Sequence, residues 1–225
     1  MKRAFYDRLA PTYDADIATS DELGVFPFAG YKDVQTIIAA EITDNYPLYP
    51  VTVLDLGIGT ATLYQRIMPE KIRLTGIDYS RKMLDIAALC VPNATLIEHD
   101  LQNGLPESIA QNRYDCIVAN YFFHDYSADE LIAWIERLTH SLTTFGKIYI
   151  GDAMFLNHFA KNECKNHHHD GFDTFPHYHV FEDIVAKIKG KLSLSYLEIT
   201  HQSGVIVIAN YRECSLHNRE ILVKY

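Results

Sequence analysis

The chain has 225 residues, of which 48% are hydrophobic and 22% are charged, a composition that excludes a disordered or fibrous protein. Twenty lysines and arginines stand against 29 aspartates and glutamates, so the net charge is −9, and an acidic chain repels phosphate backbones and disfavours nucleic acid as a partner. No apolar run reaches the roughly 18 residues that a membrane span needs, and we expect no signal peptide because the N-terminus lacks an apolar core. The four cysteines are scattered, so we expect a reduced cytoplasmic protein.

Strand-like and helix-like segments alternate along the chain. Short apolar runs predict strands, and apolar residues that repeat every three or four positions predict helices. The segment 127–143 is the best supported helix, because Ser127 and Glu130 form a capping-box signature. Another helix is expected to begin after Ser80, a favourable N-cap residue. The other expected elements are strands at 51–56, 72–78, 94–100, 114–120, 146–155, 192–200 and 204–211, and helices at 60–68 and 180–188.

This alternation predicts the fold class. Strands separated by helices pair in parallel, with helices on both faces of the sheet. The last two strands are joined by the short turn 201–203, which requires an antiparallel hairpin. We therefore expect an α/β fold with a doubly wound, mostly parallel seven-stranded sheet that ends in this hairpin. We expect a single domain, 1–225, with an N-terminal cap at 1–50 and a lid insertion at 156–179, which is too long for a plain connection.

Polar residues follow four successive predicted strands, where ligands bind in a doubly wound sheet. Gly57 and Gly59 form a tight turn in which a ligand can approach the backbone at a helix N-terminus. Asp78 ends the second strand, and its spacing from Gly59 is that at which an acidic residue reaches ribose hydroxyls. Asp100 ends the third strand, and the fourth is followed by Asn120-Tyr121-Phe122-Phe123-His124-Asp125. These strand ends converge on one crevice.

The motifs resemble those of the class I S-adenosylmethionine (SAM)-dependent methyltransferases. The segment 53–60 (VLDLGIGT) resembles the first motif of that family, and 76–80 (GIDYS), followed by Met83-Leu84, resembles the second. The resemblance extends over roughly 30–211 and implies a Rossmann-like methyltransferase fold with SAM as methyl donor. Ala61 stands where the family often has a third glycine. Thr62, at the sixth position of G-x-G-x-x-G/A, and Asp55 disfavour the alternative of an NAD-dependent oxidoreductase.

The resemblance also implies which residues hold the donor. Asp55, Gly57 and Gly59 would line the methionine end, with Asp55 holding the ammonium group. Asp78 would accept hydrogen bonds from the ribose hydroxyls; alternatively, Asp78 is a helix-capping residue. A cationic sulfonium is compatible with an acidic crevice that has aromatic walls.

The adenine end and the reacting end follow from the same resemblance. Tyr79 and Met83 would flank the adenine, Asp100 would accept a hydrogen bond from its amino group, and Leu101 would pack on the ring. Asn120 would contact the donor near its sulfonium.

The acceptor side depends on fewer residues. His124 should face the transferred methyl group as a catalytic residue; alternatively, it is a helix-entry residue with a satisfied ring. The segment around Tyr13 resembles the cap of small-molecule methyltransferases, in which a Tyr-Asp pair folds over the donor; alternatively, it is an amphipathic surface helix. We expect the acceptor pocket between the loop 121–124, this cap and the lid. The motif N-P-P-[YF], which marks methylation of amide or exocyclic amine nitrogens of nucleic acids and proteins, is replaced by NYFF at 120–123.

The lid contains six histidines, which raises the question of a metal site. Zinc and nickel bind imidazole, but His167, His168 and His169 are adjacent and cannot all point to one side, so we expect a solvated lid without metal; a third possibility is that one lid histidine acts as a base. The sequence thus predicts a SAM-dependent methyltransferase that acts on a small molecule by direct displacement, as a monomer or homodimer. The alternative is a non-catalytic SAM-binding or metal-sensing regulatory protein.

Overall fold

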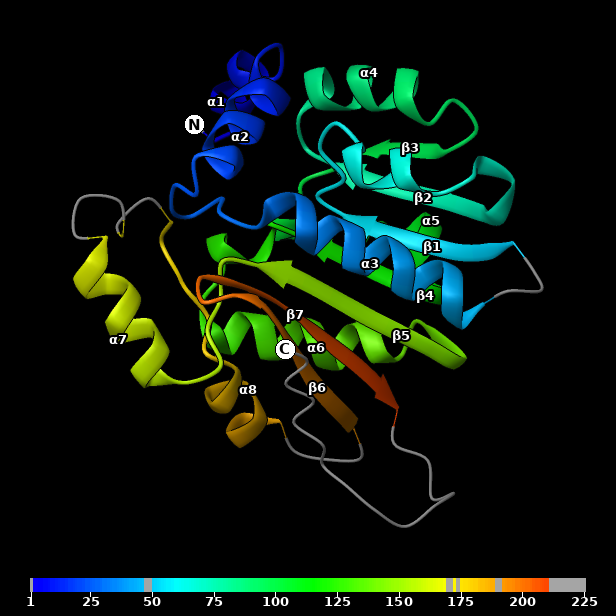
Figure 1. Ribbon diagram of the computed structural model, residues 1–225. Helices are drawn as coiled ribbons and strands as arrows, with labels where there is room; N and C mark the ends of the chain where they lie inside the picture. Colours follow the sequence, from blue (N-terminus) through cyan, green and yellow to red (C-terminus); the bar gives the residue numbers. More distant parts are fainter. Residues whose placement is uncertain (1, 47–49, 169–171, 173–174, 189–191, 211–225) are drawn as a thin grey trace.

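A computed structural model describes residues 2–46, 50–168, 172, 175–188 and 192–210 (Figure 1). Its centre is a seven-stranded sheet with the order β3-β2-β1-β4-β5-β7-β6. The pairs from β3 to β5 are parallel, whereas β7 runs antiparallel to both β5 and β6, which confirms the predicted fold class. The strands are β1 (Val51–Leu56), β2 (Ile72–Asp78), β3 (Thr95–Glu98), β4 (Tyr114–Asn120), β5 (Leu142–Asp152), β6 (Leu192–Thr200) and β7 (Ser203–Asn210).

Helices cover both faces of the sheet, because the side chains on both faces of the central strands are apolar and must be buried. One face packs against α3 and α4, and the opposite face packs against α6 and α8. The α-helices are α1 (Lys2–Leu9), α2 (Tyr13–Glu22), α3 (Tyr31–Asn45), α4 (Arg81–Cys90), α5 (Glu107–Ala110), α6 (Ala128–Thr139), α7 (His158–His167) and α8 (Phe181–Lys187). The short 3-10 helices are η1 (Thr62–Arg66), η2 (Pro69–Lys71), η3 (Leu101–Asn103) and η4 (Phe123–Asp125).

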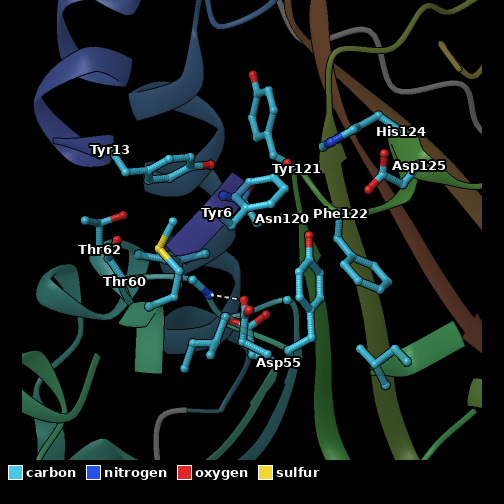
Figure 2. A pocket seen from close by; sticks show the side chains of 18 of the residues that line it. Tyr6, Tyr13, Asp55, Thr60, Thr62, Asn120, Tyr121, Phe122, His124 and Asp125 are labelled. Carbon is cyan, nitrogen blue, oxygen red and sulfur yellow. Dashed lines mark hydrogen bonds between the residues drawn. The ribbon is translucent and has the colours of Figure 1, made fainter. Parts of the chain in front are cut away.

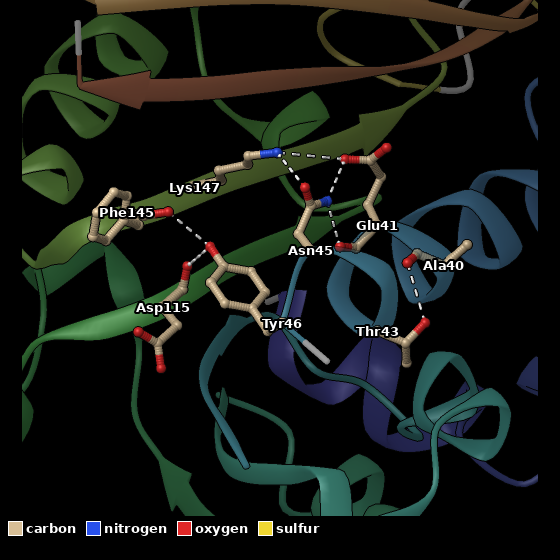
Figure 3. A network of polar contacts seen from close by, with 8 residues as sticks. All are labelled: Ala40, Glu41, Thr43, Asn45, Tyr46, Asp115, Phe145 and Lys147. Carbon is tan, nitrogen blue, oxygen red and sulfur yellow. Dashed lines mark hydrogen bonds and ion pairs between the residues drawn. The ribbon is translucent and has the colours of Figure 1, made fainter. Parts of the chain in front are cut away.

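The N-terminal segment has two parts with different positions. Helices α1 and α2 stand beyond the carboxyl ends of the parallel strands (Figure 1). Helix α3 instead lies on the sheet and is fixed at the opposite edge by polar contacts (Figure 3). There the Tyr46 hydroxyl lies 2.9 Å from the carbonyl oxygens of both Asp115 and Phe145, and Lys147 donates a hydrogen bond to Asn45 at 3.0 Å. Within the N-terminal segment, α1, α2 and the chain that follows them lie at the carboxyl edge, and α3 reaches it only at its N-terminal end.

Several element boundaries differ from those predicted. The capping box of Ser127 and Glu130 is present, but α6 ends at Thr139 because β5 begins at Leu142, which pairs with Tyr114. The expected helix at 60–68 is the 3-10 helix η1, preceded by Ala61 in the left-handed conformation with a φ of +65°. Strand β5 ends at Asp152 rather than at 155. The last residue of the predicted strand 204–211 lies outside the described residues.

Candidate active site

A cavity of ≈600 Å³ lies at the carboxyl ends of the parallel strands, beneath the cap helices (Figure 2). This volume falls in the range of roughly 300–1,000 Å³ that is common for small-molecule sites. The cavity brings together the residues predicted to hold the donor and the predicted catalytic residue: Tyr13, Asp55, Gly57, Gly59, Asp78, Tyr79, Met83, Asp100, Leu101, Asn120 and His124. The switch in strand order at β1 and β4 positions this convergence, as expected for a doubly wound sheet.

The loop after β1 is shaped by its two glycines. Gly57 and Gly59 have φ angles of +75° and +55°, a region that side chains rarely adopt. A Cβ at Gly57 would meet Phe122 at 2.5 Å, whereas a Cβ at Gly59 would meet nothing within 4 Å. The backbone N–H groups of Gly57 and Ile58 donate to the Ile77 carbonyl, which fixes the loop to β2. Gly57 thus permits close packing, and Gly59 leaves open space for a ligand at the backbone.

Asp78 joins this loop to the start of α4. Its carboxylate accepts hydrogen bonds from the backbone N–H groups of Gly59 at 3.0 Å and Ser80 at 2.8 Å. Burial raises its pKa to about 6, while the hydrogen bonds from Ser80 and Gly59 oppose that shift. Ser80 itself caps α4 by accepting from Met83. Asp78 therefore holds the local structure together in addition to facing the cavity.

Asp55, at the base of the cavity, is only 3% exposed, and its Oδ1 has no hydrogen-bond partner among the described residues. Burial raises its pKa to about 7; the neighbouring Tyr64 phenol lowers the pKa, and the Asp78 carboxylate raises it. An unpartnered buried carboxylate oxygen is unfavourable unless a ligand supplies a donor or a positive charge. Asp55 is therefore suited to a cationic group.

The turn after β4 contains two further buried polar groups that have no hydrogen-bond partner within the described part of the chain. Asn120 Oδ1 is buried without a partner, and Gly151 on the neighbouring strand leaves room for it, since a Cβ there would lie 2.9 Å from that oxygen. Tyr121 has a φ of +51°, and its buried hydroxyl also has no partner. Its ring packs at 4.7 Å from that of Tyr31, which also lines the cavity. A strained residue that supplies an unpartnered polar group is typical of functional sites.

His124 is buried beside Asp152. The Asp152 carboxylate is fully buried, accepts a hydrogen bond from the backbone N–H of His124 at 3.2 Å, and lies 3.5 Å from the ring Nδ1. Nδ1 and the Asp152 carboxylate do not form a hydrogen bond in this geometry. The ring of Phe175 stacks on the imidazole at a centroid distance of 3.7 Å. Tyr121 belongs to the loop 121–124 that was expected at the acceptor pocket. Sequence reasoning missed Asp152 and Tyr31, although an aspartate that ends an apolar strand is a usable signal for Asp152.

The cap is attached to the cavity by short hydrogen bonds. Thr60 donates to Asp14 at 2.6 Å, and Ser80 donates to Asp7 at 2.6 Å. Tyr6 lines the cavity and makes an edge contact with Tyr79 at 5.9 Å. Helices α1 and α2 thus lie against both donor motifs.

The lid occupies a different position from the one expected. None of the described residues of 156–179 lines the cavity; the lid instead packs behind His124 through Phe175 and against Phe26 of the cap segment through Phe172. Its described histidines have protein contacts: His158 lies 3.0 Å from Asp183, and His179 contacts the Phe123 carbonyl at 2.9 Å. Within the described part of the chain, no group of three or more His, Cys, Asp or Glu residues is arranged to hold a metal ion.

This sheet and this set of strand ends define a class I SAM-dependent methyltransferase. The family model described as "Methyltransferase domain" matches residues 53–146. An uncharacterized methyltransferase of Bacillus mycoides is 30% identical over 157 residues, which is 69% of this chain and 68% of that protein. The chain belongs to this methyltransferase family.

Solved structures support the fold. The "DhpI-SAM-HEP complex" superimposes with a TM-score of 0.64 at 18% identity, over 92% of this chain and 95% of that one. The plantazolicin methyltransferase BpumL, in complex with a triazolic desmethylPZN analog and SAH, has a TM-score of 0.62 at 18% identity, over 94% of this chain and 98% of that one. Within the described residues, no helix is long and apolar enough to span a membrane.

Proposed function

We propose that this protein transfers the methyl group of SAM to a small-molecule acceptor by direct displacement. The observation that carries the proposal is the convergence of both donor motifs and His124 on one covered cavity of ≈600 Å³. A cavity of this size, roofed by α1 and α2, suits a small acceptor better than a folded protein or a nucleic acid duplex. We assign the whole chain, 1–225, to one methyltransferase domain, in which α1 and α2 of the segment 1–50 form the cap and the insertion 156–179 packs against His124 through Phe175.

The residues present are compatible with the donor. The unpartnered oxygen of Asp55 would accept from the ammonium group of SAM, and the open space at Gly59 would admit the ligand against the loop. Asp78 would accept from the ribose hydroxyls, because its oxygens retain lone pairs beyond those used by the backbone. When bound, SAM supplies a methyl group activated by a cationic sulfur.

The remaining proposed donor contacts lie along the same wall. Tyr79 and Met83 would flank the adenine, with Leu101 on the ring and Asp100 accepting from the amino group. Asn120 would orient the sulfonium through its unpartnered Oδ1. Tyr13 would close over the donor from the cap.

His124 would act as the proton acceptor for the incoming nucleophile. Its Nδ1 faces the buried Asp152, and no described residue hydrogen-bonds its Nε2. A carboxylate behind one ring nitrogen fixes the ring and stabilises the imidazolium that forms when the other nitrogen takes a proton.

Two measurements test the proposal. Calorimetric titration of the purified protein with SAM and with its demethylated product, S-adenosylhomocysteine (SAH), should show saturable binding of both. A screen of a metabolite extract with labelled SAM should then reveal a labelled small product. Folded protein that gives no heat at millimolar ligand would falsify the proposal.

A further inference from the structure

The part of the cavity around His124 is aromatic and acidic. Tyr6, Tyr121, Phe122 and Asp125 line the same cavity as His124 (Figure 2), and the Tyr31 ring packs on that of Tyr121. Five carboxylate residues line the cavity as a whole, and among the residues with described side chains no lysine or arginine does so. This composition differs from that of a site for a carboxylate or phosphate, which arginine or lysine usually binds.

The charges that act on this region are negative. The pKa of Tyr6 is raised, first by burial and then by the carboxylates of Asp125, Asp78 and Asp152. The pKa of Tyr121 is also raised, first by burial and then by Asp152 among its neighbours. Both phenols stay protonated at neutral pH, so their ring faces and neutral hydroxyls line a space of negative potential. A cation gains from both features, because aromatic faces attract positive charge.

Two polar groups in this space form no hydrogen bond with a described residue, so a ligand can contact them. The Tyr121 hydroxyl is buried and unpartnered, and its position is set by a backbone with a φ of +51°. His124 Nε2 is the second group, since the other ring nitrogen faces Asp152 at 3.5 Å. Each of these groups can accept an N–H from a ligand.

We propose that the methyl acceptor is a small amine that enters this space as its ammonium form. The inference rests on the proposed function and specifies the substrate class of the same site. The carboxylates and aromatic faces bind the ammonium, and His124 Nε2 then takes one proton from it. The neutral nitrogen that results uses its lone pair to form a bond to the methyl carbon while the carbon–sulfur bond breaks and its electron pair stays on sulfur. The products are a methylated ammonium, SAH with a neutral sulfur, and protonated His124.

Loss of the proton is required because a tetrahedral ammonium nitrogen has no lone pair with which to attack. Asp152 contributes by stabilising the imidazolium that forms, and it does so without contacting the acceptor. An anionic acceptor would instead be placed among Asp125, Asp152 and the donor carboxylates, in a cavity that no lysine or arginine with a described side chain lines.

Three aromatic probes of similar shape test the proposal by binding alone. The protein is saturated with SAH and titrated calorimetrically at pH 7.5 with benzylamine, benzyl alcohol and benzoate, which are cationic, neutral and anionic, respectively. We expect benzylamine to bind about tenfold more tightly than benzyl alcohol, which corresponds to about 1.4 kcal/mol, and benzoate to bind most weakly. The variant Asp125→Asn should lose most of the preference for the amine. Asp129→Asn makes the same change of charge at an exposed residue outside the cavity and should keep it.

The outcomes separate this inference from the proposed function. If SAH itself fails to bind, the proposed function is wrong. If SAH binds and benzoate or benzyl alcohol equals or exceeds benzylamine, or no probe binds, the amine assignment is overturned while donor binding stands. If Asp125→Asn is not folded by circular dichroism, Tyr121→Phe tests the same space, since it keeps the ring and should weaken benzylamine more than benzyl alcohol; equal weakening would contradict the proposal.

Discussion

The buried carboxylate of Asp55 predicts that donor binding depends on pH. Burial raises its pKa to about 7, so the group is largely protonated at pH 6, whereas the proposed contact with an ammonium needs the ionised form. For a pKa of about 7, the affinity for SAH should rise about eightfold between pH 6 and pH 7.5. Asp78, with a pKa of about 6, adds about a further twofold.

Replacement of Asp55 by Asn tests this reasoning. Loss of a hydrogen bond to a charged group should weaken SAH by about 1.5–3 kcal/mol at pH 7.5, and the pH dependence should shrink to the twofold effect of Asp78. Calorimetry at pH 6 in two buffers with different ionisation enthalpies should show release of about 1.4 protons per SAH by the wild type and about 0.5 by the variant, which retains only Asp78. Asp85→Asn, on the exposed face of α4, is the matched control. Equal affinity at pH 6 and 7.5 in the wild type would refute the contact.

Asp55 also affects the free energy of unfolding. The effect has the opposite sign to that of a carboxylate whose pKa is lowered on folding. A folded-state pKa raised from 3.8 to about 7 means that the folded protein holds the proton more tightly than the unfolded chain. The contribution of Asp55 to the free energy of unfolding is therefore present at low pH and is lost as pH rises towards and through 7, by about 4 kcal/mol in all. Without ligand, Asp55→Asn should unfold at a higher temperature than the wild type at pH 8 while binding SAH more weakly. A lower unfolding temperature would contradict this account.

Three further predictions concern the loop, the carboxylate bridge and the cap. Asp78→Ala should weaken SAH by about 1.5–3 kcal/mol and also lower the free energy of unfolding by about 1–3 kcal/mol, because the N–H groups of Gly59 and Ser80 lose their acceptor; urea unfolding that matches the wild type would contradict the second part. Gly59→Ala should cost roughly 1 kcal/mol of stability from its left-handed backbone and reduce SAH affinity, whereas Gly57→Ala should cost more, since its Cβ meets Phe122 at 2.5 Å; the opposite order in thermal unfolding would show that the loop is misassigned. Deletion of 2–14 removes the hydrogen bonds of Asp7 and Asp14 and should reduce turnover more than it reduces SAH affinity. If both fall equally, the cap contributes only to donor binding.

The donor half of the site could be predicted from the sequence because its signals are local. The strands Val51–Leu56 and Tyr114–Asn120 are apolar runs buried on both faces, so their bounds follow from composition. The glycine turn and Asp78 have a fixed spacing along the chain, and that spacing is sufficient to bring them together across adjacent parallel strands.

The acceptor half could not be predicted in the same way, because its residues are brought together by register and by long-range packing. Asp152 reaches His124 only because β5 pairs with β4 and ends at that level. The left-handed backbone of Tyr121 has no signal in its residue type. The sequence of the lid contains no pattern that predicts where it packs. Its residue Phe175 stacks on His124, and none of its described residues lines the cavity.

The stacking of Phe175 on His124 separates two properties of the protein that could otherwise be coupled. One face of the imidazole is covered by a ring from the segment between β5 and α8, whereas the glycine turn and its carboxylates come from β1 and β2. The contact of Phe175 with the His124 ring therefore comes from a part of the chain that shares no residue with the donor motifs. We therefore expect substitutions at Phe175 to change the reactivity of His124 while leaving the affinity for the donor unchanged.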